Sequence, residues 1–309
     1  WNIENKEQIA LIVSPHGDPV GVAVVGEYLL IAHENGTLTT WTIDDHMLVD
    51  TLRGHEGIVW NVKRLDDHRA SSVGKDGDIR WWKIGQPPLK EIIVESGLPA
   101  VDLVFADEDQ VAIVSHVSSN LQVANVSTGN SRVIPTPSYQ KLTVVDAIFG
   151  SNLVITGDLS GTIRTWDIAS NTAGGSIGTL DSEIVSLTIS NDEKFVAAGS
   201  LDGTVGVWNI QTSQRIFSLT IEGSLILDVD FSLNNPLLFV SASEEELAAF
   251  NFHTGKQIWS TDVMRTDVFV VDVVPLSNHI LTATSRGLIQ LRDSKTGDVL
   301  KTAQSKGGG

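Results

Sequence analysis

A short phrase that recurs at a nearly constant interval constrains the fold of this chain more than any other feature. The phrase is an aromatic residue, one further residue and an aliphatic residue, as in Trp41-Thr42-Ile43. Successive copies lie 41 or 42 residues apart. They begin at Trp41, Trp82, Trp166 and Trp208, with weaker copies at Ala124, Phe250 and Arg292. Such regularity indicates a chain built from structural repeats.

Each interval holds about four short segments of alternating or β-branched residues, separated by Asn, Asp, Gly and Ser. This pattern is typical of a strand meander with tight turns. Four strands per repeat at this period predict an all-β fold, namely a seven-bladed β-propeller of four-stranded antiparallel blades. We expect a single domain over residues 1–309 with a flexible tail at 305–309. The inner three strands of the blades are expected near residues 20–43, 58–84, 100–126, 144–168, 184–210, 227–252 and 268–293.

Composition excludes several other classes of protein. The chain has no cysteine, so it can form neither disulfides nor cysteine-ligated zinc or iron–sulfur sites. With 21 Lys and Arg against 38 Asp and Glu, its net charge is −17, which argues against direct binding of nucleic acid. No apolar stretch is long enough to cross a bilayer, so we expect no membrane insertion.

The second repeat carries Gly54-His55, Ser72, Asp76-Gly77 and Trp82. With these residues the chain resembles the WD-repeat family. The resemblance implies that His55, Ser72, Asp76 and Trp82 form a hydrogen-bonded structural set that locks one blade together. It also implies an intracellular protein, cytoplasmic or nuclear, that has no cofactor and acts within a larger protein or complex.

Two segments compete to complete the last blade: residues 8–14 and residues 298–303. The family usually closes its ring with an N-terminal strand, which favours residues 8–14. The opening Trp1-Asn2-Ile3 repeats Trp208-Asn209-Ile210, which suggests a piece of a longer protein with further repeats.

We predict no catalytic residues and no metal site, and therefore no enzyme. The eight histidines include no pair at metal-ligand spacing on one element and no His-Glu-x-x-His motif. One motif supports a rival hypothesis: residues 249–259, which end in Thr254-Gly255-Lys256-Gln257-Ile258-Trp259, resemble the blade signature of quinoprotein-like propellers. That resemblance would imply an enzyme with a redox cofactor or a periplasmic scaffold.

Equivalent positions in the repeats suggest where a partner would bind. The position just inside the first strand is predicted to hold aspartate in four repeats: Asp102, Asp146, Asp228 and Asp272. Trp60 is assigned to the same position in the second repeat, and exposed tryptophan is common at binding hot spots. Two residues before the third-strand aromatic, Arg80 and Arg164 are the charged members of a small or polar set. The face with these residues is expected to carry more than half of the excess negative charge.

The sequence therefore predicts a non-catalytic protein-interaction scaffold. Its acidic loop face would bind a Lys/Arg-containing peptide or basic protein surface, with Trp60, flanked by Arg80, as the apolar anchor and the four aspartates as charge partners. An alternative is a reader of phosphorylated or acidic motifs, which would use Arg80 and Arg164.

Overall fold

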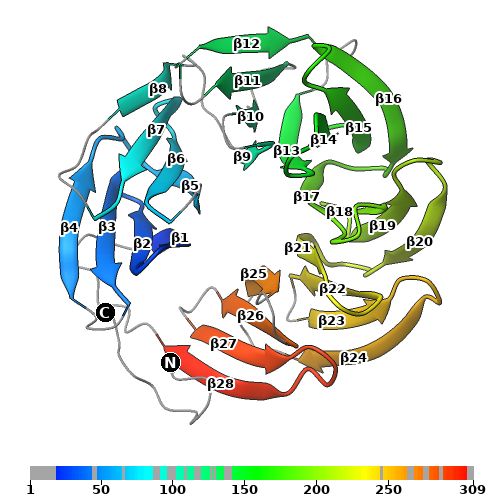
Figure 1. Ribbon diagram of the computed structural model, residues 1–309. Coiled ribbons are helices and arrows are strands. Elements are labelled where there is room, and N and C mark those ends of the chain that lie inside the picture. Colours follow the sequence, from blue (N-terminus) through cyan, green and yellow to red (C-terminus); the bar gives the residue numbers. More distant parts are fainter. Residues whose placement is uncertain are drawn as a thin grey trace. The chain divides into compact units, whose positions relative to one another are not determined.

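The computed structural model describes most of the chain as strands (Figure 1). The described residues are 19–43, 47–64, 67–85, 91–95, 102–107, 110–114, 120–125, 128, 130–135, 141–243, 246–262, 268–273, 278–284 and 288–304. Every element in this part of the chain is a strand, and the strands form four-stranded sheets in chain order. Among the described residues, no helix has the length and hydropathy that a bilayer-spanning segment needs. The all-β fold with four-stranded antiparallel propeller blades is thus confirmed.

The chain divides into two compact units. The N-terminal unit comprises the described residues of 19–155 and 166–174, and it contains three complete sheets. The first sheet is β1 (Pro19–Val25), β2 (Tyr28–His33), β3 (Thr37–Thr42) and β4 (Leu48–Arg53). The second is β5 (Val59–Arg64), β6 (Arg69–Gly74), β7 (Asp78–Lys83) and β8 (Glu91–Glu95). The third is β9 (Asp102–Phe105), β10 (Gln110–Val114), β11 (Leu121–Asn125) and β12 (Ser131–Ile134).

The C-terminal unit comprises the described residues of 156–165 and 175–304, and it also contains three complete sheets. One is β17 (Ile184–Ile189), β18 (Phe195–Ser200), β19 (Thr204–Asn209) and β20 (Arg215–Thr220). The next is β21 (Ile226–Phe231), β22 (Leu237–Ala242), β23 (Glu246–Asn251) and β24 (Lys256–Asp262). The last is β25 (Val268–Val273), β26 (His279–Thr284), β27 (Leu288–Asp293) and β28 (Val299–Gln304).

The prediction of seven equivalent blades in one ring needs correction. Six sheets each lie wholly within one or the other unit. The remaining sheet is divided between the two units and consists of β13 (Leu142–Ala147), β14 (Leu153–Asp158), β15 (Thr162–Asp167) and β16 (Thr172–Thr179). One dividing point falls between Gly174 and Gly175, in a strand whose residues are mostly exposed. Gly174 and Gly175 offer no side chain for packing at this point.

The preferred choice of a closing strand was also wrong. The fourth strand of the last sheet is β28, which pairs with β27 from Leu288↔Gln304 to Arg292↔Val299. Asp293 accepts hydrogen bonds from the backbone N–H groups of Lys295 and Thr296, at 2.8 and 3.0 Å, and so forms the connecting turn. A hairpin joined by a short turn requires little loop-closure entropy. Residues 8–14 lie outside the described residues.

Neighbouring sheets within a unit pack face to face through apolar side chains. One core cluster joins the first two sheets: Val25, Leu30, Ala32, Leu38, Leu52, Val59, Val62, Ala70, Trp82 and Ile84. In the C-terminal unit, a second cluster joins the sheets that begin with β17 and β21, and it includes Val207, Phe217, Phe231 and Phe250. The alternation of buried and exposed residues along the strands supplies these faces.

Candidate functional site

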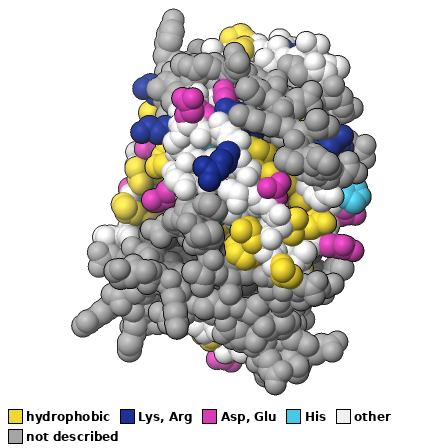
Figure 2. Space-filling view, turned by 90° about the vertical axis from the view of Figure 1, so that its left-hand side faces the viewer, with side chains coloured by type: hydrophobic (Ala, Val, Ile, Leu, Met, Phe, Trp, Pro, Cys, Tyr) yellow, Lys and Arg dark blue, Asp and Glu magenta, His cyan; other side chains and the backbone are white. Residues whose placement is uncertain are grey.

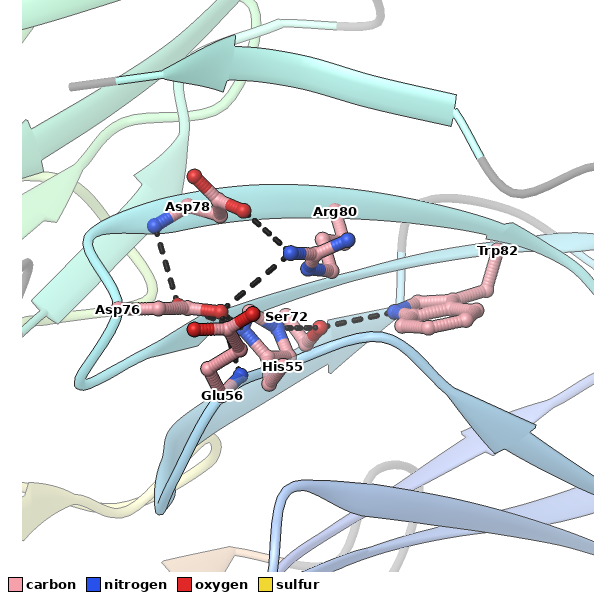
Figure 3. Close-up of polar contacts among 7 residues, drawn as sticks. All are labelled: His55, Glu56, Ser72, Asp76, Asp78, Arg80 and Trp82. Carbon is pink, nitrogen blue, oxygen red and sulfur yellow. Dashed lines mark hydrogen bonds and ion pairs between the residues drawn. The ribbon is translucent and has the colours of Figure 1, made fainter. Parts of the chain in front are cut away.

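The second sheet brings together the four residues of the WD-like set (Figure 3). Nδ1 of His55 lies 2.8 Å from Oδ1 of Asp76, and Nε2 of His55 lies 2.7 Å from Oγ of Ser72. The indole N–H of Trp82 donates to the same Ser72 oxygen at 2.8 Å. A carboxylate can only accept, so the imidazole proton lies on Nδ1 and the Ser72 hydroxyl donates to Nε2. We call these four residues the blade lock.

Asp76 also interacts with groups outside the blade lock. Its carboxylate accepts the backbone N–H groups of Glu56 at 2.8 Å and Asp78 at 3.2 Å. The guanidinium of Arg80 lies 3.4 Å from Asp76 and is also paired with Asp78 (Figure 3). The Arg80 side chain is only 5% exposed, although its Nε and one terminal nitrogen have no hydrogen-bond partner. Arg80 therefore belongs to the interior of this sheet.

Burial and hydrogen bonding set the protonation of the blade lock. Burial lowers the pKa of His55, and the hydrogen bond to Asp76, which raises it, does not compensate. Burial acts to raise the pKa of Asp76, but the hydrogen bonds from His55 and the Glu56 N–H outweigh it, and the net shift is downward. A neutral imidazole thus faces an ionised carboxylate. Ser72 and His55 are buried, so this Ser–His–Asp arrangement holds strands together instead of presenting a nucleophile.

The first sheet contains a variant of the lock that the sequence pattern did not reveal. The indole N–H of Trp41 donates to Oγ1 of Thr39 at 2.9 Å, and Nε2 of His33 lies 2.9 Å from the same oxygen. Here the hydroxyl comes from the same strand as the tryptophan, two residues earlier. The signal in the sequence was a threonine at the position that Arg80 occupies in the next repeat.

Two of the predicted ring aspartates connect neighbouring sheets. Asp102 accepts the side-chain N–H of Asn61 at 3.3 Å and the backbone N–H of Val145 at 3.0 Å. Burial raises the pKa of Asp102, against the opposing effects of Lys63 and these hydrogen bonds. Asp228 accepts the hydroxyl of Ser186 at 2.8 Å. These two carboxylates therefore already accept hydrogen bonds from neighbouring sheets.

The structure corrects the alignment of the four aspartates. A register shift marks the start of the first strand in five sheets, immediately before Gly21, Asn61, Ser186, Asp228 and Val270. Asp102 occupies the equivalent position in its sheet, because it accepts a hydrogen bond from Asn61 in the preceding sheet just as Asp228 accepts one from Ser186. Asp272 lies two residues beyond Val270, and the 42-residue interval places Asp146 equally late. The bulge at the start of the first strand supplies the common reference point for this alignment.

The bulge also explains the position of Trp60. Its neighbours Val59 and Asn61 pair with Gly74 and Val73, so Trp60 is the extra residue of the bulged strand. Its side chain is 44% exposed, which is high for a residue of this size in a strand. An inserted residue is freed from the alternation of the sheet and can turn outward.

The remaining predicted site residues are dispersed. Asp146 lies half-buried on β13 and accepts the N–H of Ala147 at 2.8 Å. Arg164 lies half-buried on β15, in the other unit from Arg80. Asp272 lies in β25, but its side chain is outside the described residues. Across the described ranges, no group of three or more His, Asp or Glu side chains could hold a metal ion.

The tryptophan of the quinoprotein-like motif has a packing role. Trp259 on β24 is buried and donates its indole N–H to the carbonyl of Ser294 in the next sheet, at 3.0 Å. It also contacts Gly297, where an added Cβ would lie 2.6 Å from the ring. Arg292 stands where other repeats have tryptophan, and burial lowers its pKa. Trp259 thus joins two sheets.

Exposed side chains of different kinds are interspersed on the face that Figure 2 shows, where hydrophobic groups lie beside acidic and basic ones. Met47 and Phe149, which lie in connections between strands, are among the most exposed apolar residues of the N-terminal unit. Among the residues that the structure describes, the side shown in Figure 2 is not uniformly acidic.

Comparison with known proteins places this geometry in context. Residues 174–209 match the family model described as WD domain, G-beta repeat. The chain is 29% identical over 90 residues to the Shk1 kinase-binding protein 15 of Schizosaccharomyces pombe, a match that covers 28% of this chain and 26% of that protein. It is 22% identical over 135 residues to the SIR4-interacting protein SIF2 of Saccharomyces cerevisiae, covering 43% of this chain and 25% of that protein.

These matches span about a quarter of the length of each of the two relatives. Among solved structures, the computationally designed Ika8 protein is similar, with a TM-score of 0.79 and 21% identity over 95% of this chain and 90% of that one. This last likeness concerns the fold alone. The chain therefore carries a WD40 repeat, and its resemblance to the WD-repeat family is confirmed.

Proposed function

We propose that the chain is a non-catalytic protein-interaction scaffold that binds a Lys/Arg-containing peptide or protein surface at the loops before the first strands. The WD40 repeat supports an interaction role, and the two relatives are named for binding a kinase and for interacting with SIR4. The net charge of −17 favours a cationic partner, because opposite charge speeds the encounter.

Trp60 is the observation that carries the proposal. A large aromatic side chain that is 44% exposed leaves much of its apolar area open to a partner. Glu56 is exposed in the loop that precedes β5, and Glu34 is exposed in a turn that adjoins this loop, since Gly36 contacts the carbonyls of His55 and Gly57. Trp60 would supply apolar contact area, while the two glutamates would attract partner cations.

The half-buried ring aspartates have a smaller part in this proposal than the sequence suggested. Asp102 and Asp228 already accept hydrogen bonds between sheets, so they contribute to the field instead of pairing directly with a partner. A reader of phosphorylated motifs is disfavoured, because the guanidinium of Arg80 is buried and paired with two carboxylates.

Replacement of Trp60 tests the proposal. We expect Trp60→Ala to weaken capture of partner proteins from a source lysate by about tenfold or more, as for a hot-spot aromatic residue. The matched control is Val133→Ala, which changes another exposed apolar residue of the same unit, 51% exposed on β12. Quantitative mass spectrometry of the captured proteins, at low and high salt, gives the measurement. Equal capture by the wild type and Trp60→Ala would contradict the role of Trp60.

A further inference from the structure

The C-terminal unit has a continuous loop edge with three exposed leucines. The edge is formed by residues 158–162, 180–184, 200–204 and 221–225, and its leucines are Leu159, Leu201 and Leu225, which are 38%, 37% and 46% exposed. We call it the leucine edge. Isolated exposed leucines are ordinary in soluble proteins, so their arrangement has to carry the inference.

Backbone hydrogen bonds join these loops to one another. The N–H of Leu180 donates to the carbonyl of Gly161 at 2.9 Å, and the N–H of Leu201 donates to that of Glu183 at 3.0 Å. The N–H of Ile221 then donates to the carbonyl of Gly203 at 2.9 Å. The next sheet continues the series, since Ser243 donates to the carbonyl of Leu225 at 2.8 Å. The three leucines thus lie on one pre-organised edge.

The fold does not require leucine at the tips of these turns. Four turns share the same geometry, in which a glycine N–H bonds to the carbonyl three residues earlier at 3.0 to 3.1 Å: Gly36 to His33, Gly77 to Gly74, Gly161 to Asp158 and Gly203 to Ser200. The residue after the accepting one is Glu34, Lys75, Leu159 and Leu201 in turn. A charged residue therefore serves this position equally well, and the leucines call for another explanation.

The charge of the edge restricts what could cover it. Its four segments contain Asp158, Asp181, Glu183, Asp202 and Glu222, and they contain no Lys, Arg or His. Asp181, Asp202 and Glu222 are exposed. Hydrogen bonds from Ser200 and Thr204 outweigh the effect of burial and lower the pKa of Asp202, so it is charged at neutral pH. An apolar row among carboxylates is complementary to a segment that combines apolar and cationic side chains.

We propose that the leucine edge is a docking site for a peptide segment of a partner protein in which apolar side chains alternate with Lys or Arg. The inference rests on the proposed interaction function and adds a second contact region, in the unit that does not contain Trp60. Apolar side chains of the segment would cover Leu159, Leu201 and Leu225. Its cations would pair with Asp181 and Glu222, while Asp202, which accepts hydrogen bonds from Ser200 and Thr204, would add to the negative field that favours rapid association at low salt.

Fluorescence anisotropy with three labelled synthetic peptides of equal length tests the proposal. The first peptide combines Leu with Lys, the second has Glu in place of Lys, and the third has Ser in place of Leu. We expect the whole chain to bind the first peptide and to bind the other two at least about tenfold more weakly, since each lacks one half of the interaction. Equal binding of all three peptides, or no binding of the first, would overturn the proposal.

Variants of the protein locate the binding. We expect the double variant Leu159→Ser, Leu201→Ser to bind the first peptide about tenfold or more weakly, and Glu222→Lys to weaken it mainly at low salt. The control Ile258→Ser removes an apolar side chain that is 41% exposed on β24, and it should leave binding unchanged. Unchanged melting temperatures would show that the turns tolerate the substitutions. An equal loss in Ile258→Ser would overturn the proposal.

Trp60→Ala in the same titration separates this proposal from the broader one. Binding of the first peptide that remains in the double leucine variant and is then lost when Trp60→Ala is added belongs to the Trp60 region, whereas binding that the leucine substitutions remove belongs to the leucine edge. If Trp60→Ala loses partner capture while the leucine variants bind the peptide normally, the leucine edge is refuted and the interaction function stands. If both sets of variants behave as the wild type does in every assay, both proposals fail.

Discussion

Single residues in the second sheet show how one hydroxyl can organise a blade. Ser72 satisfies the indole of Trp82 and the imidazole of His55 with one oxygen atom, in a buried position. The neighbouring Ser71 is equally buried, but its hydroxyl has no hydrogen-bond partner. The two adjacent serines therefore form a natural pair for comparison.

We expect Ser72→Ala to lower the free energy of unfolding by about 1–3 kcal/mol, because it leaves two buried polar nitrogens without a partner. Ser71→Ala should change it by much less, since no hydrogen bond is lost. Urea unfolding followed by tryptophan fluorescence gives both values. Equal losses in the two variants would show that the blade lock adds no stability beyond burial.

His55 makes the stability of the lock depend on pH. Burial lowers the pKa of the folded imidazole below its ordinary value of 6.5, so the unfolded chain binds this proton more readily. Stability should therefore fall as the pH drops from about 6.5 towards the folded pKa. Asp76 has a lowered pKa, and its contribution is lost only at more acidic pH, below 3.8.

The free energy of unfolding, measured by urea at a series of pH values, should show this decline in the wild type. The variant His55→Asn removes the titrating group, so we expect a flatter profile in the same range and a lower stability at neutral pH. If the variant keeps the slope of the wild type, another group is responsible for the pH dependence.

At the scale of elements, turns fix where strands end and bulges determine which side chains are exposed. The turn between the third and fourth strands repeats one device: Asn125, Asp167, Asn209, Asn251 and Asp293 each accept backbone N–H groups two or three residues later. These residues are the middle positions of the recurring phrase found in the sequence. The phrase therefore marks a strand end and its turn, whereas the bulges that expose Trp60 leave no such mark.

Two glycines with similar φ angles allow the cost of backbone strain to be separated from the cost of steric overlap. Gly161 and Gly150 have φ angles of 84° and 79°, a region that side chains disfavour. A Cβ at Gly161 would overlap the carbonyl oxygen of Leu180 and lie 2.6 Å from that of Ser182, whereas nothing lies within 4 Å at Gly150. Gly161 is thus required for the close approach of two loops of the leucine edge.

We expect Gly150→Ala to cost about 1 kcal/mol, which is the conformational penalty alone. Gly161→Ala should cost about 3 kcal/mol or more, because backbone has to move as well. Thermal unfolding of both variants measures the difference. Similar melting temperatures would mean that the loops of the edge can separate without loss.

On the scale of the whole molecule, some acidic residues form hydrogen bonds within the fold and others are exposed on the surface. Asp76, Asp102 and Asp228 are used in hydrogen bonds within or between sheets. Asp181 and Glu222 lie exposed on the leucine edge, whose segments contain no basic residue, and the exposed Asp202 of that edge also accepts hydrogen bonds from Ser200 and Thr204. The net charge of −17 is a property of the sequence, but only the packing separates the carboxylates that hold sheets together from those that a partner could meet.

The sequence by itself determined the repeat and the four-stranded antiparallel blade, because these depend on local alternation, turn residues and a fixed interval. The residues of the blade lock came from the resemblance to the WD-repeat family. The tertiary structure showed that the first strand of five sheets begins with a bulge, and the residue after each bulge gives the equivalent position in those sheets. It decided that Arg80 is buried and that Trp60 is exposed. It also supplied the fourth strand of the last sheet from Val299–Gln304, because the adjacent strand can pair through a short turn. Such choices depend on contacts between distant residues, which periodicity does not record.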